Sequence, residues 1–328
     1  MKKALIIRLS SIGDIVLTTP VVRCLKEQRP GIEVHFLTKQ SFRLLLEPNP
    51  YIDQVHTFDG DLKSLIEVLK KEQFDYVIDL HNNQRTWLIK KALRTETHSF
   101  NKINVEKWLM VNLKWNRLPS IHIVDRYLET VASLGVKNDG KGLDYFIPAK
   151  QEINITEHFP EVKSGEYIAA VIGAKHATKQ MPKTKWMTLC ELIDKPVIVL
   201  GGRDDAEMGE EIAYKSGKGV FNACGKFRLH ESASIVRQAQ KVISHDTGLM
   251  HIAAAFDKEI ASIWGNTIPE FGMFPYLPKD GKGSYEAFEV KSLGCRPCSK
   301  IGYPKCPKKH FACMDLIDET LIADWANG

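Results

Sequence analysis

The sequence predicts an α/β protein made of two doubly wound halves, each with a parallel sheet covered by helices on both faces. Short apolar runs alternate with helical patterns through all 328 residues, which is typical of parallel sheets. The alternation pauses once, at residues 137–165, where glycines, prolines and polar residues indicate turns and a linker. We therefore expect an N-terminal domain at residues 1–150 and a C-terminal domain at residues 151–328.

The N-terminal half opens on a buried strand. Its clearest helix is amphipathic, because four apolar residues between Leu62 and Leu69 fall on one face. Strands are expected at residues 5–7, 33–37, 54–57 and 76–80, and helices at about residues 13–27, 62–71 and 123–134.

The C-terminal half repeats the pattern, and each of its strands runs into a glycine or a polar loop. Ligands of doubly wound sheets bind at the carboxyl ends of the strands, so these loops are the first candidates for function. Strands are expected at residues 167–172, 196–200, 242–244 and 260–264, and a final helix at residues 315–325.

Composition limits the class of protein. Apolar residues make up 44% and charged residues 26%, as in soluble globular proteins. A net charge of +5 is too mild to indicate nucleic-acid binding. Arg8 interrupts the first apolar run before it reaches the roughly 7–15 residues of a signal peptide. No run reaches the ~20 apolar residues of a membrane span, so we expect a cytoplasmic protein without a nucleic-acid partner.

The first chemical motif is Ser10-Ser11-Ile12-Gly13-Asp14, directly after the first strand. Gly13 permits a ligand to approach the backbone, and the start of the following helix favours anions. Asp14 has the chemistry of a general base. Asp is also a common helix cap, so the local pattern leaves both interpretations open.

The second motif, Gly173–Pro182, leaves the first strand of the C-terminal half. It combines the hydroxyl of Thr178 with the charges of Lys175 and Lys179, ahead of a helix that starts at a proline. Lysine charge and loop N–H groups suit a diphosphate. A solvated basic loop would have the same composition.

The third motif is His245-Asp246-Thr247-Gly248-Leu249-Met250-His251. Gly248 is expected to open a helix whose first turn presents N–H groups to a phosphate. Thr247 adds a hydroxyl, and His251 lies one turn on, on the same side. The alternative is an ordinary helix cap with His251 in the core. Three such loops at strand ends make that alternative less attractive for the set than for any one loop.

A cysteine cluster lies near the C-terminus. Four thiolates can hold a structural zinc, but the second pair is spaced too widely for a usual zinc knuckle. We expect reduced, partly buried thiols and no metal ion. The cluster comprises Cys295, Cys298, Cys306 and Cys313, with His310 nearby.

The three motifs, in this order and spacing, resemble the glycosyltransferase family of ADP-heptose:lipopolysaccharide heptosyltransferases, glycosyltransferase family 9. The family pattern has Ser-x-Gly-Asp near the N-terminus, Lys-x-x-Pro after the linker, and Asp-Thr-Gly-x-x-His late in the chain. Residues 11–14, 179–182 and 246–251 match it. The resemblance runs nearly end to end, and residues 246–251 are its most specific part.

The resemblance implies a GT-B fold, in which two Rossmann-like domains face a central cleft and bind the acceptor on the N-terminal and the nucleotide sugar on the C-terminal domain. It implies an inverting transfer of a sugar, heptose from ADP-heptose, to a lipopolysaccharide-core acceptor without a catalytic metal or other cofactor. Asp14 is then the base, and Lys179 stabilises the departing diphosphate. The residues implied to bind the donor are Thr178, Lys179, Asp246, Thr247, Gly248 and His251.

Two departures keep alternatives open. Met181 stands where the family usually has Trp, and the loop of residues 202–207 holds several acids that could contact the ribose. Another nucleotide-sugar donor is therefore an alternative. So is a non-catalytic nucleotide- or sugar-binding protein in which Asp14 only caps a helix.

A basic stretch at residues 85–117 fits a glycolipid acceptor. It carries eight Lys or Arg and two Glu, a net 8 − 2 = +6, and Trp87, Trp108 and Trp115 interleave with the cations. An anionic, phosphorylated glycolipid would bind such a face, with peripheral contact to the inner membrane. A solvated helical surface is the alternative.

Overall fold

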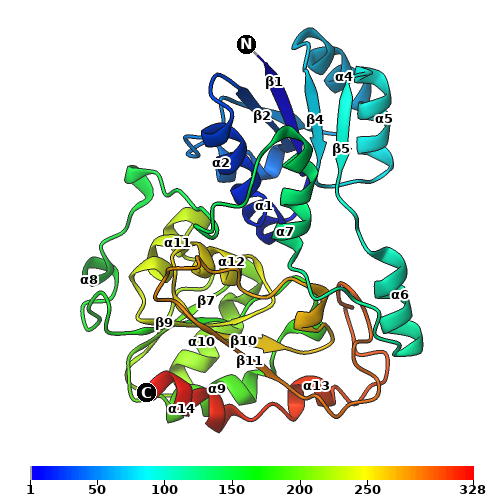
Figure 1. Ribbon diagram of the computed structural model, residues 1–328. Coiled ribbons are helices and arrows are strands. Elements are labelled where there is room, and N and C mark those ends of the chain that lie inside the picture. The colour runs from blue at the N-terminus through cyan, green and yellow to red at the C-terminus, as the bar shows by residue number, and fades with distance from the viewer. Residues whose placement is uncertain (1) are drawn as a thin grey trace. The chain divides into compact units, whose positions relative to one another are not determined.

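The chain folds into two compact units, which a computed structural model describes for residues 2–328 (Figure 1). The N-terminal unit comprises the chain up to residue 102 together with residues 121–146. The C-terminal unit comprises residues 103–120 and 147–328. The sequence pattern had put residues 103–120 in the N-terminal domain. The structure differs because this segment packs on the C-terminal unit, and the chain then returns for one more helix.

The N-terminal unit is built on a five-stranded sheet in the order β3-β2-β1-β4-β5, with every pair parallel. The chain moves outward from β1 to β3 and then returns to the other side of β1 for β4, so its direction reverses between β1 and β4. The strands are β1 (Lys3–Ile7), β2 (Glu33–Lys39), β3 (Gln54–Phe58), β4 (Tyr76–Asp79) and β5 (Glu96–Ser99).

One helix expected in this unit is two helices in the structure. Pro20 lies in the first turn of the second helix and has no N–H to donate to the carbonyl of Val16. The Thr19 hydroxyl donates to that carbonyl instead, at 2.7 Å. The helices of the unit are α1 (Ile12–Val16), α2 (Thr19–Gln28), α3 (Arg43–Leu46), α4 (Leu62–Lys71), α5 (Gln84–Leu93) and α7 (Ile123–Leu128).

The C-terminal unit has a six-stranded parallel sheet in the order β11-β10-β9-β6-β7-β8. Its chain also starts at a central strand, moves outward to β8, and returns to the other side of β6 for β9. The reversal therefore lies between β6 and β9. The strands are β6 (Ile168–Val171), β7 (Val197–Leu200), β8 (Val220–Asn222), β9 (Lys241–His245), β10 (Glu259–Trp264) and β11 (Tyr285–Glu289).

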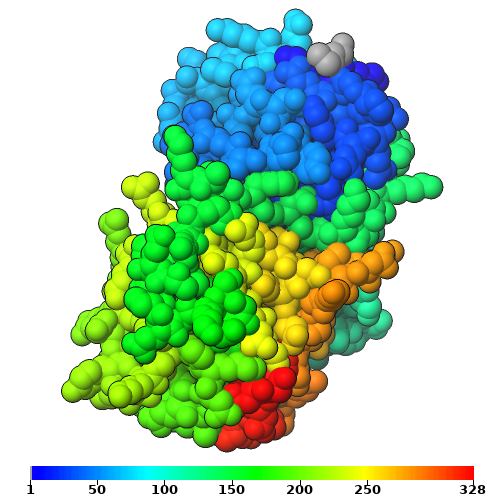
Figure 2. All heavy atoms as spheres, turned by 90° about the vertical axis from the view of Figure 1, so that its left-hand side faces the viewer, coloured from blue at the N-terminus to red at the C-terminus, as the bar shows by residue number. Residues whose placement is uncertain are grey.

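Helices cover this sheet, and the last one packs on α9, as the red and green segments of Figures 1 and 2 show. Side chains of α14 such as Ile322 and Ala326 are buried in the same apolar core as Trp186 of α9. The longer helices are α6 (Asn104–Leu113), α9 (Lys183–Leu192), α10 (Ala206–Lys215), α11 (Leu229–Gln238), α12 (Gly248–Ala255) and α14 (Glu319–Asn327), and the short ones are α8 (Ile155–His158) and α13 (Ala312–Asp315). Within residues 2–328, no helix has the length and apolar character needed to cross a bilayer.

Part of the expected linker is bound to the N-terminal unit by one buried arginine. Arg23 on α2 is 2% exposed and forms a two-pronged ion pair with Asp139, at 2.8 and 3.0 Å. It also pairs with Asp144 and donates to the Gly142 carbonyl at 2.8 Å. Because a guanidinium fits carboxylates in this planar way, residues 139–144 are fixed on α2.

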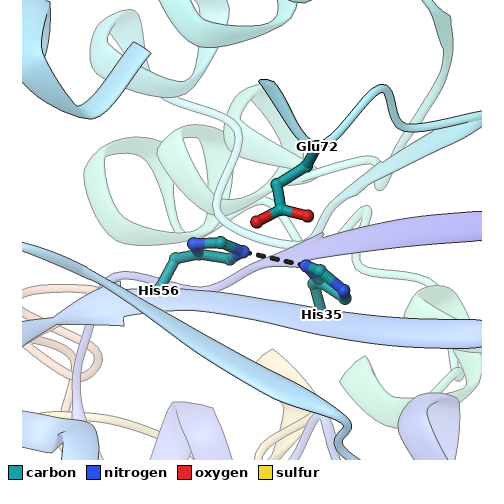
Figure 3. A group of neighbouring side chains, drawn as sticks. All are labelled: His35, His56 and Glu72. Atoms are coloured by element: carbon teal, nitrogen blue, oxygen red, sulfur yellow. Dashed lines mark hydrogen bonds between the residues drawn. The ribbon is translucent and has the colours of Figure 1, made fainter. Parts of the chain in front are cut away.

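A pair of histidines is buried in the N-terminal core (Figure 3). His35 Nδ1 on β2 lies 2.9 Å from His56 Nε2 on β3, and Glu72 follows α4 beside them. His35 Nε2 lies 2.8 Å from a Glu33 oxygen. Phe74 packs edge-on against both rings, at centroid distances of 5.1 and 6.1 Å. His35 Nδ1 and His56 Nε2 therefore satisfy each other, and Glu33 serves the second nitrogen of His35.

We predict that His56 makes the N-terminal unit sensitive to mild acid. Burial, and then the neighbouring His35, lower the pKa of His56 from its ordinary 6.5 to about 4. As the pH falls, the unfolded chain therefore binds this proton at a higher pH than the folded chain does. The contribution of His56 to the free energy of unfolding is present above pH 6.5 and is lost as the pH falls towards 4. Between pH 7 and pH 5 the loss from this group should be about 2 kcal/mol.

Urea denaturation of wild type and of His56→Gln at both pH values measures this loss. Gln can keep a hydrogen bond to His35 but does not titrate, so the variant should lose about 2 kcal/mol less than wild type over this range. Equal pH dependence of the two proteins would contradict the assignment.

Candidate functional site

The loops after β6 and β9 are neighbours because β6 pairs with β9 at the centre of the second sheet. Parallel strands place their carboxyl ends at one edge, and the reversal of chain direction between β6 and β9 leaves the two loops leading away in opposite directions. Such a switch point is where doubly wound sheets bind ligands. The two sequence motifs Gly173–Pro182 and His245–His251 therefore meet at one place.

An ion pair joins the two motifs. The Lys179 ammonium pairs with Oδ2 of Asp246 and also donates to the Asp246 backbone carbonyl at 3.3 Å. The Thr267 hydroxyl, from the loop after β10, donates to the same Oδ2 at 3.2 Å. An ammonium group has three N–H donors, so Lys179 retains one donor after these two bonds. Asp246 thus orients a lysine that can still serve a phosphate oxygen.

Helix α12 begins beside this pair, as the sequence predicts. Thr247 is its N-cap residue and Gly248 its first residue. The Thr247 hydroxyl lies 3.3 Å from the hydroxyl of Ser244 at the end of β9. His251 is 2% exposed and belongs to the buried side of the helix. The first-turn N–H groups at residues 248–250 are therefore the candidate anion-binding part of this motif.

The backbone that carries Lys179 is held by buried neighbours. Met181 is 1% exposed, and its N–H donates to Nε2 of His245 at 2.9 Å. Trp186 packs edge-on against the same ring, with the centroids 5.4 Å apart. Burial lowers the pKa of His245 to about 3, so this imidazole stays neutral and acts as a hydrogen-bond acceptor. Met181 is therefore a core residue that fixes the turn after Lys179.

Thr178 has a structural partner that the sequence did not reveal. It is 2% exposed, and its hydroxyl accepts from the Tyr303 N–H at 2.8 Å and donates to the Tyr303 carbonyl at 3.2 Å. The Thr178 N–H donates to the same carbonyl, also at 3.2 Å. Thr178 thus ties the cysteine-rich loop to the candidate site, and its hydroxyl is already engaged.

Among the acids of the loop after β7, Asp205 faces the sheet. Its carboxylate accepts from the Gly202 N–H at 2.8 Å, and a side chain at Gly173 or Gly201 would collide with it. Burial raises its pKa. Asp204 and Glu207 are exposed. Asp205 is therefore the candidate among these acids, because its carboxylate lies at the carboxyl edge of β6 and β7.

A pocket of about 630 Å³ opens next to Asp205 at the loops after β7 and β8. Its position beyond the carboxyl ends of β7 and β8 is that of a nucleoside site in a doubly wound sheet. Three cations and one aromatic ring line it, which suits an anionic ligand with a planar base. The lining residues are Gly202, Arg203, Gly225, Lys226, Phe227, Arg228 and Glu231.

Asn266 is a candidate that the sequence reasoning missed. It lies between the end of β10 and Thr267, is 1% exposed, and both its amide atoms have no hydrogen-bond partner within residues 2–328. Unsatisfied buried amides are rare in folded proteins and often have a functional cause. The available signal was the Gly-Asn-Thr sequence at a strand end.

In the N-terminal unit, Asp14 is both a helix-capping residue and an ion-pair partner. Its Oδ2 accepts from the Ser11 N–H at 3.1 Å and from the Ser11 hydroxyl at 2.7 Å, a capping box with Ser11 as N-cap. Its Oδ1 lies 2.5 Å from Arg8 Nη2. The carboxylate stands after β1 at the switch point with β4, and its side chain is 20% exposed. Asp14 thus makes the capping hydrogen bonds, and its carboxylate remains accessible to solvent.

Arg8 and His81 complete this edge of the first sheet, and neither was singled out in the sequence. Arg8 also donates to the Leu80 carbonyl at 2.6 Å and to the Tyr127 hydroxyl at 2.9 Å. His81 follows β4, and its buried Nδ1 has no hydrogen-bond partner in the described chain. Burial, then the charges of Arg8 and Lys102, lower its pKa to about 4. A neutral imidazole therefore stands near Asp14.

The four clustered cysteines come from residues 295–313, and the Cys298 thiol lies near those of Cys295, Cys306 and Cys313. Within residues 2–328, the one group of three potential ligand atoms that all lie within 4.8 Å of one another is His35, His56 and Glu72. Cys295 Sγ lies 3.8 Å from His310 Nε2. Cys313 is buried and the other three are partly exposed.

Known proteins resemble this chain over most of its length. Residues 62–300 match the family model described as glycosyltransferase family 9 (heptosyltransferase). Lipopolysaccharide heptosyltransferase 1 of Campylobacter coli is 26% identical over 288 residues, which cover 81% of this chain and 84% of that protein. A glycosyl transferase family 9 structure from Veillonella parvula has a TM-score of 0.72 and 21% identity, covering 87% of this chain and 86% of that chain. E. coli heptosyltransferase WaaC with ADP has a TM-score of 0.65 and 21% identity, covering 92% and 96%.

Replacing Lys179 should weaken binding of a nucleoside diphosphate. A charge-assisted hydrogen bond contributes roughly 1.5–3 kcal/mol, so Lys179→Ala should lower the affinity for ADP by about 10- to 150-fold. Calorimetry with ADP and AMP measures this effect. The loss should be larger for ADP, whose second phosphate can reach the ammonium.

Lys183→Ala is the matched control, because Lys183 pairs with Glu211 and belongs to α9. It should bind ADP as wild type does. An equal loss in both variants, or none in Lys179→Ala, would transfer the phosphate role to another residue, with Lys175 the next candidate.

Thiol labelling should divide the cysteines into two groups. Three partly exposed thiols, Cys295, Cys298 and Cys306, should react quickly with a disulfide reagent. The buried four should react only on unfolding, because burial raises the pKa of Cys24 to about 11 and those of Cys190, Cys224 and Cys313 to about 12. Protection of the first group that a chelator removes, with stoichiometric zinc by elemental analysis, would instead show a metal site.

Proposed function

Because the chain belongs to glycosyltransferase family 9, the heptosyltransferase family, we propose that it transfers heptose from ADP-heptose to a lipopolysaccharide-core acceptor with inversion of the anomeric carbon. The protein is a glycosyltransferase, and its two Rossmann-like units form a GT-B fold. One observation carries the proposal: Lys179, oriented by Asp246, stands beside the N-terminus of α12 at the switch point of the second sheet.

The donor is a nucleoside diphosphate sugar. Its diphosphate would lie against the remaining N–H of Lys179 and the first-turn N–H groups of α12, which favour negative charge. The pocket beside Arg203 and Phe227 would take the nucleoside, and Asp205 would accept from the ribose hydroxyls. An adenine nucleotide is supported by the two WaaC structures, one with ADP and the other with ADP-2-deoxy-2-fluoro heptose.

The reaction follows from these roles. Asp14 accepts the proton of an acceptor hydroxyl as that oxygen bonds to the anomeric carbon. The bond from the anomeric carbon to the β-phosphate oxygen breaks, and ADP leaves with its electron pair. Lys179 and the α12 N–H groups stabilise the negative charge that develops on the diphosphate. Attack opposite the leaving group inverts the anomeric centre, and these groups supply the charge without a catalytic metal.

The acceptor is an anionic, phosphorylated glycolipid. The Campylobacter coli relative and the E. coli one are both named lipopolysaccharide heptosyltransferase 1, and the lipid-linked core carries such groups. We place the reaction at the cytoplasmic face of the inner membrane, where a protein of this kind meets the growing glycolipid.

A second function, nucleotide or sugar binding without turnover, is favoured by one observation. The Asp14 carboxylate already accepts from Ser11 and pairs with Arg8, so a purely structural role would explain its geometry. Exposure supports catalysis instead, because Asp14 is the more exposed member of the pair, at 20% against 10% for Arg8. A carboxylate at an accessible edge can accept the proton of an acceptor hydroxyl.

Asp14→Asn tests the base. Turnover should fall by roughly 10²–10⁴, while ADP affinity should stay unchanged, because the proposed donor contacts lie in the C-terminal unit. The amide can keep the bond from the Ser11 N–H but loses the ion pair with buried Arg8. Stability should therefore fall by about 1–3 kcal/mol, and rates should be measured well below the melting temperature.

Ser11→Ala is the matched control for capping. It removes the N-cap hydroxyl, at a cost of about 1 kcal/mol, but leaves the carboxylate in place. Its turnover should fall by no more than about tenfold, because the loss of the one hydrogen bond from the Ser11 hydroxyl to the Asp14 carboxylate corresponds to a roughly tenfold effect. Near-normal turnover in Asp14→Asn would remove Asp14 from the mechanism. Absence of sugar transfer or donor hydrolysis in wild type, with ADP binding intact, would favour the binding protein.

A further inference from the structure

Helix α6 exposes an unusual apolar stripe. Within α6, no residue is buried, and Val105, Trp108 and Leu113 are 69%, 56% and 59% exposed. Val105, Trp108, Leu109 and Leu113 are spaced i, i+3, i+4 and i+8, so they form one face of the helix. The opposite side contacts the unit, since Lys107 Nζ lies 5.7 Å from the centre of the Phe271 ring. The apolar face is therefore the solvent face.

The cysteine-rich loop continues this surface. Lys114, at the end of α6, donates to the carbonyls of Cys295 and Pro297 at 3.2 and 2.7 Å. Lys300 Nζ lies 3.4 Å from the side-chain oxygen of Asn104. Ile301 is 55% exposed beside this contact. Two segments almost 200 residues apart in sequence thus form a single face of the C-terminal unit.

Positive charge dominates this face. Residues 300–309 contain four Lys and no Asp or Glu, and residues 103–120 contain three Lys or Arg and one Glu. Lys305, Lys308 and Lys309 are exposed and have no ion-pair partner within residues 2–328. The Arg117 guanidinium lies 4.4 Å from the centre of the half-exposed Trp115 ring.

We infer that this face, α6 with residues 114–117 and 300–309, docks the C-terminal unit on an anionic membrane surface. Tryptophan and tyrosine concentrate where lipid headgroups meet the acyl chains, and lysine and arginine bind anionic headgroups. An amphipathic helix with an apolar solvent face and flanking cations is the element that lies in this interface. The choice of a membrane over another partner rests on the proposed function, whose acceptor is lipid-linked.

The basic stretch of residues 85–117 is divided between the two units, because α5 belongs to the N-terminal unit and α6 to the C-terminal unit. The cations that accompany α6 come instead from the distant cysteine-rich loop. The docking face therefore belongs to the unit that is proposed to bind the donor.

Sedimentation with vesicles tests the inference on the full chain. Wild type should bind vesicles of phosphatidylcholine with ~30% phosphatidylglycerol, bind pure phosphatidylcholine weakly, and lose affinity as salt rises. The triple variant Lys305→Gln, Lys308→Gln, Lys309→Gln should bind the anionic vesicles about 100-fold more weakly, at roughly fivefold per charge. Trp108→Ser should also weaken binding but keep the salt dependence.

The matched control removes three exposed charges of the same unit that lie outside the face, Lys150→Gln, Lys163→Gln and Lys218→Gln. It should bind within about threefold of wild type, because distant charges are screened. Equal weakening in both triple variants would overturn the inference. So would a dimer of wild type that Trp108→Ser and Leu113→Ser dissociate, since a second copy would then cover the face.

A second measurement does not depend on altered charge. Acyl chains brominated near the headgroup should quench tryptophan fluorescence of wild type, and most of this quenching should disappear in Trp108→Phe and Trp115→Phe. Unchanged quenching in these variants would exclude the face from the membrane. Transfer to a soluble, deacylated acceptor should be the same in wild type and the triple variant. Failure of that transfer in wild type would count against the proposed function and leave the vesicle result standing.

Discussion

Parallel strand pairing is the constraint on which both units depend. Every strand pair in the two sheets is parallel, so the loops that follow the strands collect at one edge of each sheet. Each chain half starts at a central strand and fills one side of it before the other. The loops after β1 and β4, and those after β6 and β9, consequently lead apart from shared positions, and both chemical motif groups stand there.

Each switch point holds an aspartate paired with a cation of its own unit, but the two pairs differ in which partner faces solvent. Asp14 is 20% exposed and Arg8 10%, whereas Lys179 is 16% exposed and Asp246 10%. Arg8 also donates hydrogen bonds to backbone carbonyls and to Tyr127. These bonds hold the guanidinium in place, so Arg8 fixes the position of the Asp14 carboxylate. Lys179 keeps a donor. The first pair thus presents a carboxylate to solvent, and the second presents a positive charge.

The cysteine-rich loop connects the candidate donor site to the proposed membrane face. Arg296 is 7% exposed and donates to the carbonyls of Gly265 and Thr267, at 2.5 and 2.9 Å, and pairs with Glu289. Thr178 binds the same loop at Tyr303. Thr267 in turn contacts Asp246. The loop therefore holds the residues around Lys179 in place, while its outer side carries the exposed lysines.

Local pattern was sufficient for eight of the eleven strands and for the motif loops. It missed β5, β8 and β11, which lie at sheet edges and are mostly not buried. The periodicity of apolar residues marks the buried strands, and Gly248 with Thr247 announces a helix start, because these features depend on neighbours a few residues apart. The GT-B fold and the family were predicted from three motifs, whose residues and order can be seen in the sequence. The sequence also indicated Asp14 as both a cap and a candidate base, and the structure shows the capping bonds.

The remaining features depend on contacts between distant residues. The Lys179–Asp246 pair spans 67 residues, and Asn266 and His81 became candidates only when their burial was known. The apolar stripe of helix α6 has the residue spacing of a face that packs in a core. The stripe nevertheless faces solvent, and the helix packs on the C-terminal unit. The sequence by itself therefore determined the buried strands and the chemistry of the loops that follow them. Tertiary structure decided which loops and helices share a unit, because apolar periodicity records that a face is apolar but not what covers it.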